Sequence, residues 1–453
     1  MSAPQAEGGD RGGARGPGGG RGADGSPCVG GVISRLIVVE PEELPAVGLA
    51  FALFFCVMGG YFAVRPVRET VGTILGRERV ADLFVVTWAA SLIIVPVYGA
   101  IVAHLRRRVF LPLVYLGIAV ALALVGSRLE GTTGAEQIRV GQFFYVFISV
   151  LNLFVVSVFW SFLLELFTSH QSQRLFGFIA AGGTAGALCG PLITDLAVGR
   201  IGNSGVLYLG AALFVCAIGF QWLLLRLWSA RASEPHALDR PIGGNPFAGL
   251  TLVLRSPYLL GISLFVVLLA TVSTFLYFEQ LRLVEQEFPN VADRTRIFAR
   301  LDWIVQSLTI VAQIFWTGRI ASRLGVVVLL TLVPVAMVLG FGALALSGTF
   351  MTLAIVFVLR RAGEYAFVRP GREILFSPLG VETKYKAKNL IDVPVYRGAD
   401  ALAAQVSRLL SSGGYAAWVV ALIGALVSAA WAANGWLLGR RYRTIADHTS
   451  RAG

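Results

Sequence analysis

Charged residues are scarce in this chain. They occupy 14% of 453 positions, whereas hydrophobic residues occupy 56%, and the mean hydropathy is +0.72. A soluble protein carries about a quarter charged residues, so that class is excluded. Apolar runs of about 20 residues, the length of a membrane-crossing helix, recur from Leu44 almost to the C-terminus. The composition therefore predicts a polytopic protein of the lipid bilayer with no room for a soluble domain.

Cysteine and histidine are also rare, with four residues of each type. The cysteines are isolated and show no metal-ligand spacing, so we expect no disulfide and no metal site. The histidines all lie near predicted loops and leave no obvious member of a Ser/His or Cys/His catalytic arrangement. We expect neither a cofactor nor an enzymatic activity.

The apolar runs predict an all-α fold of twelve transmembrane helices. A polar linker that contains Pro and Gly divides the spans into two halves of six. This plan is typical of major facilitator transporters. We predict a disordered cytoplasmic N-terminal segment (1–43), a first half (44–228), a linker (229–256), a second half (257–438) and a cytoplasmic tail (439–453). The predicted spans are 44–66, 81–104, 109–127, 142–166, 175–197, 205–228, 257–279, 300–320, 325–346, 350–373, 389–411 and 415–438.

Arginine and lysine placement sets the predicted orientation, because these residues favour the cytoplasmic side of short loops. With the N-terminus inside, 22 of the 38 cations fall on the cytoplasmic side. Both termini are then cytoplasmic, as an even number of spans requires. The net charge of +12 is mostly this topology signal, and we expect no nucleic-acid partner. The N-terminal stretch to about Ser34 lacks the apolar middle region of a cleaved signal peptide, so we expect the first span to insert uncleaved.

Two similar charged strings interrupt the apolar sequence: 65–69, which reads RPVRE, and 369–373, which reads RPGRE. A guanidinium near the bilayer centre costs about 2.5–3.5 kcal/mol on insertion scales, so it needs a partner, a water-filled cavity or a substrate. Helical spacing places Tyr61, Arg65 and Arg68 on one stripe of the first span. A second stripe, on the tenth span, holds Arg361, Tyr365, Arg369 and Arg372.

The charges on these two spans do not balance. Residues 65–69 and 360–373 together hold six arginines and three glutamates, a surplus of three positive charges that favours an anionic solute. Arginine suits phosphate because its planar fork donates two parallel hydrogen bonds. The alternative is that these residues form internal ion pairs or gates that never touch substrate. The predicted gating or ion-pair set is Glu69, Arg361, Glu364 and Glu373, with Glu279 of the seventh span and Asp392 and Arg397 of the eleventh.

The eleventh span is the weakest in hydropathy, because it also holds Pro394 and Asp400. It is either a helix that lines a cavity or a broken helix. The chain's three lysines, Lys384, Lys386 and Lys388, precede this span. They form either a positive-inside anchor or an electrostatic collar for anions on the cytoplasmic side. The small-residue run 180–187 lacks the ending of a phosphate-binding P-loop and indicates close helix packing.

The segment 365–392, which reads YAFVRPGREILFSPLGVETKYKAKNLID, resembles the hallmark stretch of the ATP:ADP antiporter (nucleotide transporter) family, a branch of the major facilitator fold. Tyr61, Arg65 and Arg68, together with the FWSF string at 159–162 and RLFG at 174–177, resemble its first-half motifs. The likeness covers about residues 45–435, with its specific motifs confined to these three places. It implies exchange of ATP, or another nucleotide, for ADP and phosphate by alternating access.

This chain also departs from the family. Arg68 and Arg372 stand where the family has lysines proposed to meet phosphates, and Arg369 replaces its usual aspartate. Ile148 stands where an acidic residue is expected in the fourth span. Glu279, on the seventh span, lies near another acidic position of the family. These departures affect the substrate more than the fold.

Three hypotheses follow. The first is a monomeric nucleotide exchanger of a bacterial inner membrane, with Tyr61, Arg65, Arg68, Arg369 and Arg372 as substrate ligands. The second is a major facilitator transporter of another anion, proton-coupled through Glu364 or Asp392. The third is a non-transporting membrane scaffold with a structural charged core. ATP saturation without dependence on a pH gradient separates the first from the second.

Overall fold

The computed structural model describes residues 40–452 apart from 105–106, 130, 132 and 229–247. The predicted N-terminal segment up to residue 39, and most of the predicted linker, therefore lie outside the described residues. Every regular element in the described part is a helix. Because most helices are apolar around their whole circumference, they suit burial in a protein core or a bilayer. Eight of the described helices are long and apolar enough to cross a membrane.

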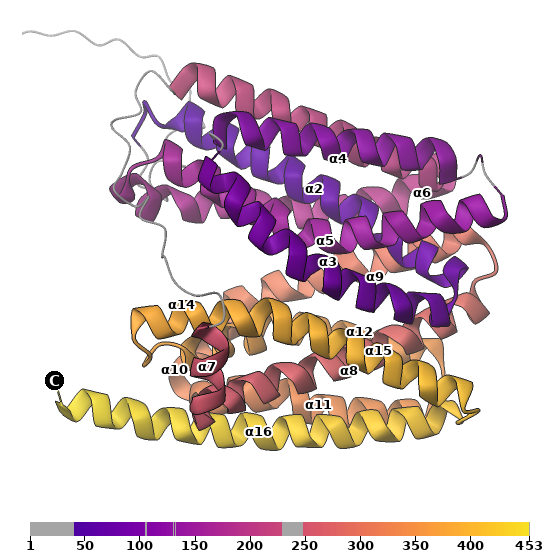
Figure 1. The fold of residues 1–453 in the computed structure, drawn as a ribbon, viewed down its shortest axis with the longest axis vertical. Helices are drawn as coiled ribbons and strands as arrows, with labels where there is room; N and C mark the ends of the chain where they lie inside the picture. The colour runs from indigo at the N-terminus through magenta and orange to yellow at the C-terminus, as the bar shows by residue number, and fades with distance from the viewer. Residues whose placement is uncertain (1–39, 105–106, 130, 132, 229–247, 453) are drawn as a thin grey trace, which may run out of the picture.

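The described part of the first half holds five helices, which make six passes because one of them is interrupted at a kink. Figure 1 shows these helices packed side by side. One of them, α6, folds back at Gly202, where the backbone φ of 66° interrupts the helix and separates the predicted fifth and sixth spans. Left-handed backbone of this kind favours glycine. The helices are α2 (Leu44–Leu75), α3 (Arg77–His104), α4 (Arg107–Leu129), α5 (Ala135–Leu166) and α6 (Ser169–Trp228).

The second half also makes six long passes, and π-helical segments continue three of them. These passes are α8 (Pro257–Glu287), α9–η1–α10 (Val291–Ala312, Gln313–Thr317, Gly318–Arg323), α11 (Gly325–Ser347), α12–η2–α13 (Phe350–Gly363, Glu364–Val368, Arg369–Leu375), α14–η3–α15 (Val381–Leu390, Ile391–Val395, Tyr396–Ser412) and α16 (Ala417–Ala452). The eleventh predicted span is thus a continuous helix with a π-helical segment at Pro394, not a broken one.

Several predicted boundaries differ from the observed ones. The helix α2 runs nine residues beyond the predicted end at 66, because Arg68 and Glu69 pair with each other and need no exit to water. The eighth pass begins at Val291 rather than 300, where the Asn290 side chain accepts a hydrogen bond from the Ala292 N–H at 2.9 Å and caps α9. A short helix, α7 (Ala248–Arg255), lies in the predicted linker, and α16 continues through the predicted tail.

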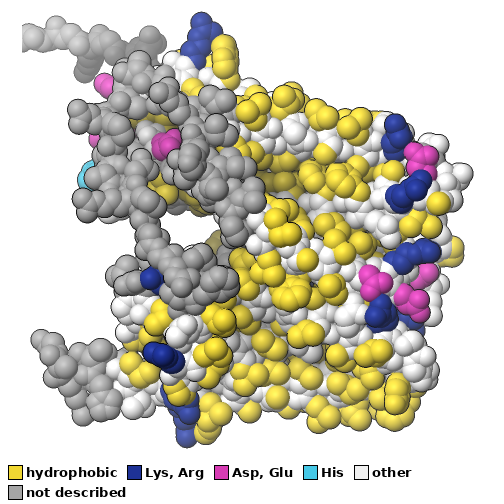
Figure 2. Space-filling view, in the orientation of Figure 1, with side chains coloured by type: hydrophobic (Ala, Val, Ile, Leu, Met, Phe, Trp, Pro, Cys, Tyr) yellow, Lys and Arg dark blue, Asp and Glu magenta, His cyan; other side chains and the backbone are white. Residues whose placement is uncertain are grey.

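The buried apolar residues form two main clusters. One is built almost wholly from α2 to α6 and the other from α7 to α16. Large apolar side chains also cover the outer flank, as at Leu339 and Leu346, which are 72% and 92% exposed. Figure 2 shows this apolar flank with charged side chains gathered toward the ends of the bundle. This distribution matches a protein surrounded by lipid.

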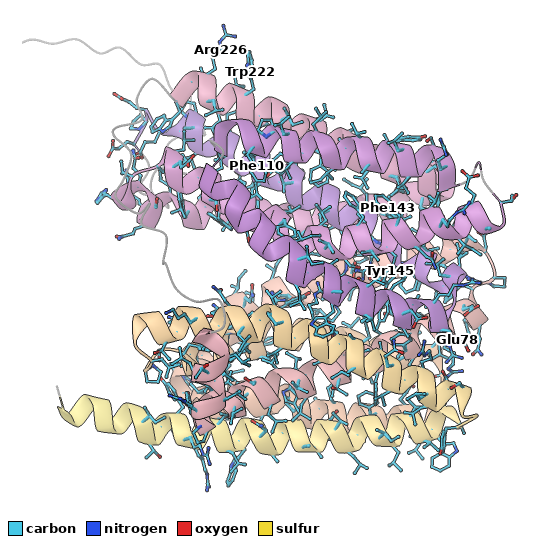
Figure 3. All side chains as sticks on the ribbon, viewed as in Figure 1. Glu78, Phe110, Phe143, Tyr145, Trp222 and Arg226 are labelled. Carbon is cyan, nitrogen blue, oxygen red and sulfur yellow. The ribbon has the colours of Figure 1, made fainter. Side chains whose placement is uncertain are left out.

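The bundle has two ends, a closed end and a linker end. At the closed end, α2 ends at Leu75 and α3 begins at Arg77; at the linker end, α6 ends at Trp228 and α7 begins at Ala248. Figure 3 shows Glu78 at the closed end, and Tyr145 of α5 where the two halves meet. In the same view Trp222 and Arg226 point away from the bundle, with the guanidinium 5.1 Å from the indole ring.

The predicted close packing at the small-residue run is confirmed for α6 against α2. A Cβ added at Gly182 would lie 2.5 Å from the carbonyl oxygen of Phe51, and one at Gly190 would lie 2.5 Å from that of Gly59. Real Cβ atoms do not approach backbone this closely, so α6 needs glycine here.

Adding a single methyl group at one of these glycines should therefore push α6 away from α2. We expect Gly190→Ala to lower stability by about 1–3 kcal/mol through overpacking, seen as a lower apparent melting temperature in detergent. Gly219→Ala is the matched control, because that position is on the same helix with nothing within 4 Å. Equal melting temperatures for the two variants would contradict the packing account.

Candidate functional site

A charged cavity lies between the two halves. The empty space within it, open solvent included, is about 880 Å³. Five arginines and three carboxylates line it, a formal surplus of two positive charges. The charged lining residues are Arg65, Arg68, Arg360, Arg361 and Arg397 with Glu69, Asp302 and Asp400.

Arg68 of α2 reaches across the first half to α5. Its guanidinium pairs with Glu69, donates to the Ser149 hydroxyl at 3.1 Å and lies 5.2 Å from the centre of the Tyr145 ring. The Tyr145 hydroxyl is 2.7 Å from that of Tyr277, on α8 of the second half. This tyrosine pair therefore joins the two halves at the cavity wall.

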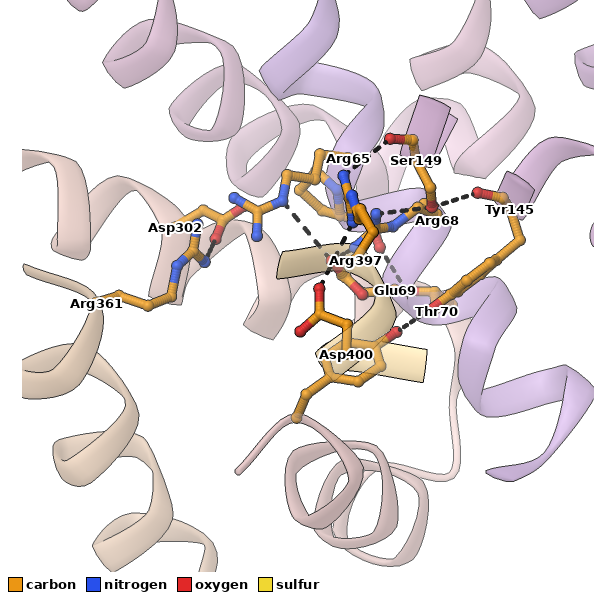
Figure 4. Close-up of polar contacts among 12 residues, drawn as sticks. Arg65, Arg68, Glu69, Thr70, Tyr145, Ser149, Asp302, Arg361, Arg397 and Asp400 are labelled. Atoms are coloured by element: carbon orange, nitrogen blue, oxygen red, sulfur yellow. Dashed lines mark hydrogen bonds and ion pairs between the residues drawn. The ribbon is translucent and has the colours of Figure 1, made fainter. Parts of the chain in front are cut away.

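Arg65, one turn earlier on α2, lies between two carboxylates. Its guanidinium is 3.7 Å from Glu69 and 3.6 Å from the Oδ2 atom of Asp302, which belongs to α9 of the second half. The other oxygen of Asp302 accepts a hydrogen bond from Arg361 of α12 at 2.5 Å. One buried carboxylate thus faces an arginine from each half (Figure 4).

The remaining two arginines come from the second half. Arg397 of α15 donates to the backbone carbonyl of Ser149 at 3.3 Å and lies 3.8 Å from Asp400. Asp400 also accepts from the Thr274 hydroxyl at 3.0 Å. Arg360 pairs with Glu364 at 2.9 Å and donates to the Ser273 hydroxyl at 2.5 Å. Each of these carboxylates therefore neutralises part of the arginine charge.

The structure brings only some of the predicted site residues together. Of the predicted set, Arg65, Arg68, Glu69, Arg361 and Arg397 line the cavity. Glu364 lies behind the cavity wall, where it pairs with Arg360. Tyr61 is buried, and its ring centre lies 5.2 Å from that of Phe62. Arg361, expected near Glu364, pairs with Asp302 instead.

The other predicted residues lie away from the cavity wall. Because a helix rises 1.5 Å per residue, Arg372 stands about 16 Å along the tenth pass from Arg361, toward the linker end. Arg369 is more than half exposed there and stacks on Tyr365 at 4.5 Å. Arg372 pairs with Asp392 at 3.1 Å and Lys388 with Glu373 at 2.7 Å, with Lys384 and Lys386 on the same short helix, α14. Glu279 pairs with Arg282 near the closed end.

Sequence reasoning missed Asp302, Tyr145, Ser149 and Tyr277. The predicted start of the eighth span at 300 put Asp302 at the membrane rim, whereas the observed start at Val291 places it about 16 Å along the helix. Asn290, a strong helix-capping residue, was the available signal. The tyrosines had no such signal, because an aromatic residue in an apolar span is usually core.

Polar contacts between the halves continue from the cavity to the closed end. Thr295 of α9 lies 2.7 Å from the Thr70 hydroxyl of α2 and donates to Asn203 of α6 at 2.7 Å. On a second seam, between α15 and α3, Arg408 pairs with Asp82 at 2.5 Å. The cavity is therefore shut toward the closed end.

No model of a protein family matches the chain, and no curated protein does. Solved structures do resemble it. A bacterial homolog of the human lysosomal transporter Spinster matches with a TM-score of 0.60 at 13% identity, covering 90% of this chain and 99% of that one. A bacterial homologue of the iron transporter ferroportin gives 0.63 at 12%, covering 86% and 99%. The nucleoside transporter NupG gives 0.62 at 16%, covering 88% and 99%.

At such low identities this likeness shows the fold alone. The chain has a fold of the major facilitator kind, as its sequence predicted. The resemblance to the ATP:ADP antiporter family stays a prediction.

Substitutions in the Arg360–Glu364 pair measure the stability lost when a buried charge has no partner. Both side chains are more than 90% buried, so removing one partner leaves an uncompensated charge at a cost of about 3–5 kcal/mol. We expect Glu364→Gln to lower the apparent melting temperature markedly and the double variant with Arg360→Gln to recover part of it. Asp293→Asn, which breaks the exposed Asp293–Arg296 pair, is the control and should have little effect. A double variant no more stable than Glu364→Gln would argue against the pair.

Proposed function

We propose that this chain is a membrane transporter that carries an organic anion by alternating access. The observation that carries the proposal is the arginine-rich cavity between the halves, with its surplus of two positive charges. Guanidinium forks suit carboxylate and phosphate groups, and a site enclosed by protein makes each contact stronger than it would be in water. Lining residues from both halves allow one solute to contact both.

The contacts between the halves support a transport cycle. Pairs such as Thr70–Thr295 and Asp82–Arg408 hold the halves together at the closed end. The Spinster and ferroportin homologues are both described as inward-facing. We assign the same state to this chain, with the linker end and both termini in the cytoplasm of a bacterial inner membrane. Residues 44–228 and 257–438 are then the two moving halves of a monomer.

A nucleotide is the substrate that we favour. Aromatic rings line the cavity beside the arginines and offer stacking surfaces for a base; they are Phe84, Tyr145, Tyr277, Phe298, Phe357 and Tyr396. Arg68, at a basic position of the antiporter family, is among the lining residues. A neighbour in fold, NupG, is a nucleoside transporter. Arg369 and Arg372 would attract the anion to the linker end rather than hold it in the cavity.

Exchange has a physical cause in this arrangement. The five cavity arginines outnumber Glu69, Asp302, Asp400 and the Glu364 carboxylate that pairs with Arg360, so the empty cavity keeps a net positive charge that is costly to enclose when the halves reorient. A bound anion removes that cost, so reorientation favours the loaded protein. The cavity carboxylates leave proton-coupled transport of another anion as the second candidate, because Glu69, Asp302 and Asp400 line the same space.

Proteoliposomes preloaded with ADP test the proposal through uptake of labelled ATP. We expect uptake that requires internal ADP and is insensitive to an imposed pH gradient. Arg68→Ala should reduce uptake at least tenfold, because a buried charged contact is worth about 1.5–3 kcal/mol. Arg79→Ala, an exposed arginine of α3, should leave uptake unchanged.

Each other outcome selects an alternative. Uptake that follows the pH gradient without internal ADP would favour the proton-coupled transporter. If folded wild-type protein takes up no ATP, and competing organic phosphates and carboxylates are not carried either, the scaffold hypothesis replaces transport.

A further inference from the structure

Asp302 is a cavity carboxylate that lies between an arginine of the first half and an arginine of the second. Its side chain is almost fully buried, one oxygen is bound by Arg361 and the other faces Arg65 at 3.6 Å. That second oxygen has no hydrogen-bond partner within the described part of the structure. A carboxylate between two guanidiniums occupies the position that a substrate phosphate or carboxylate would take.

The helix that carries Asp302 also holds the closed end together. On α9, Arg300 contacts Asp195 of α6 through two nitrogens at 3.3 Å, and the Trp303 indole N–H donates to the same carboxylate at 3.0 Å. Nearer the closed end, Arg294 donates to the Thr73 hydroxyl at 3.0 Å. Among these α9 residues it is Asp302 that lines the cavity. It therefore joins the solute space to the seam between the halves.

Resting on the proposed function, we propose that Asp302 is the built-in competitor of the substrate anion and the residue that couples binding to opening. In the empty protein its carboxylate joins Arg65 of the first half to Arg361 of the second. An entering anion takes over the two guanidiniums, and α9 loses its ionic link to α2. The closed-end seam is then weaker in the loaded protein than in the empty one.

Asp302 has opposite effects on anion binding, which it weakens, and on the link between the halves, which it strengthens. Asp302 lowers anion affinity, because it occupies both arginines and cancels one positive charge. The same contact favours the state that is shut at the closed end. An anion shifts the equilibrium between the shut and open states by the difference between its binding free energies for the two. A merely structural Asp302 would only hold Arg361, and its loss would weaken anion binding.

Binding of labelled ATP to the purified protein separates these roles. Asp302→Asn removes the competing charge while keeping an oxygen for Arg361, so it should bind ATP about tenfold more tightly at low salt. Arg65→Gln should bind at least about tenfold more weakly. Asp293→Asn removes the same charge from the exposed start of α9 and should bind as wild type does. Unchanged or weaker binding by a folded Asp302→Asn protein would overturn the proposal.

A distance measurement tests the link without any ligand. Spin labels at Thr133 and Leu346, both exposed and one in each half, report closed-end separation in a background with the four native cysteines replaced by alanine. Asp302→Asn and Arg65→Gln should each increase the longer-distance population, although they change ATP affinity in opposite directions. Asp302→Glu should restore the wild-type distribution, and Asp293→Asn should leave it unaltered.

The binding and distance measurements test the competitor role of Asp302 and its link between the halves separately. If neither Asp302→Asn nor Arg65→Gln alters the distances, Asp302 does not link the halves, whatever the substrate is. If both alter them but wild type binds neither ATP nor inorganic pyrophosphate, the anion-transport proposal and the competitor role fail, and the link between halves stands. Where Asp302→Asn does not fold, Arg65→Gln decides the link alone.

Discussion

The desolvation of guanidinium groups is the constraint on which the rest of this structure depends. Five arginines lie in a cavity within an apolar bundle, where an uncompensated charge is costly. The chain meets that cost with buried carboxylates, some on the same helix as the arginine, as Glu69 and Asp400 are, and some on a neighbouring helix, as Asp302 is. The contacts of Asp302 bring α9 beside α2 and α12 at mid-depth. Because the arginines that line the cavity outnumber the carboxylates, the cavity keeps a net positive charge.

The same constraint explains why the two halves meet as they do. Asp302 and the Tyr145–Tyr277 pair connect the halves at the cavity, and contacts such as Thr70–Thr295 continue the connection to the closed end. Neutral hydroxyl pairs break at little cost when water enters, whereas the Arg65–Asp302 contact breaks cheaply only when another anion replaces the carboxylate. An interface of this composition suits a protein that opens in response to a charged solute.

Much of the fold could be predicted from sequence, because a bilayer enforces helix length and apolar surface. Each predicted span corresponds to an observed helical pass, and even the charged eleventh span is helical. Boundaries were less predictable, since helices continue past the apolar run, as α2 does to Leu75. That difference mattered for the candidate site: starting α9 at 300 hid Asp302, while the RPVRE string drew attention to Arg65 and Arg68, which line the cavity.

The second charged string was more misleading. Identical spacing in RPVRE and RPGRE suggested equivalent roles, yet only the first lies at cavity depth; Arg372 belongs with Asp392 farther toward the linker end. Depth along a helix depends on where that helix begins, and local sequence similarity does not encode it. Which helix supplies each counter-ion is likewise a tertiary property, so the Arg361–Asp302 pair could not be predicted from residues near Arg361 in the sequence.

Comparing the affinities of ADP and adenosine for the purified protein tests the central claim most directly, because the two ligands share a base and sugar and differ in negative charge. The arginine-rich cavity predicts that ADP binds at least about a hundredfold more tightly at low salt, and that raising the salt concentration narrows the difference. Equal affinities at every salt concentration would contradict the assignment of this cavity to anions.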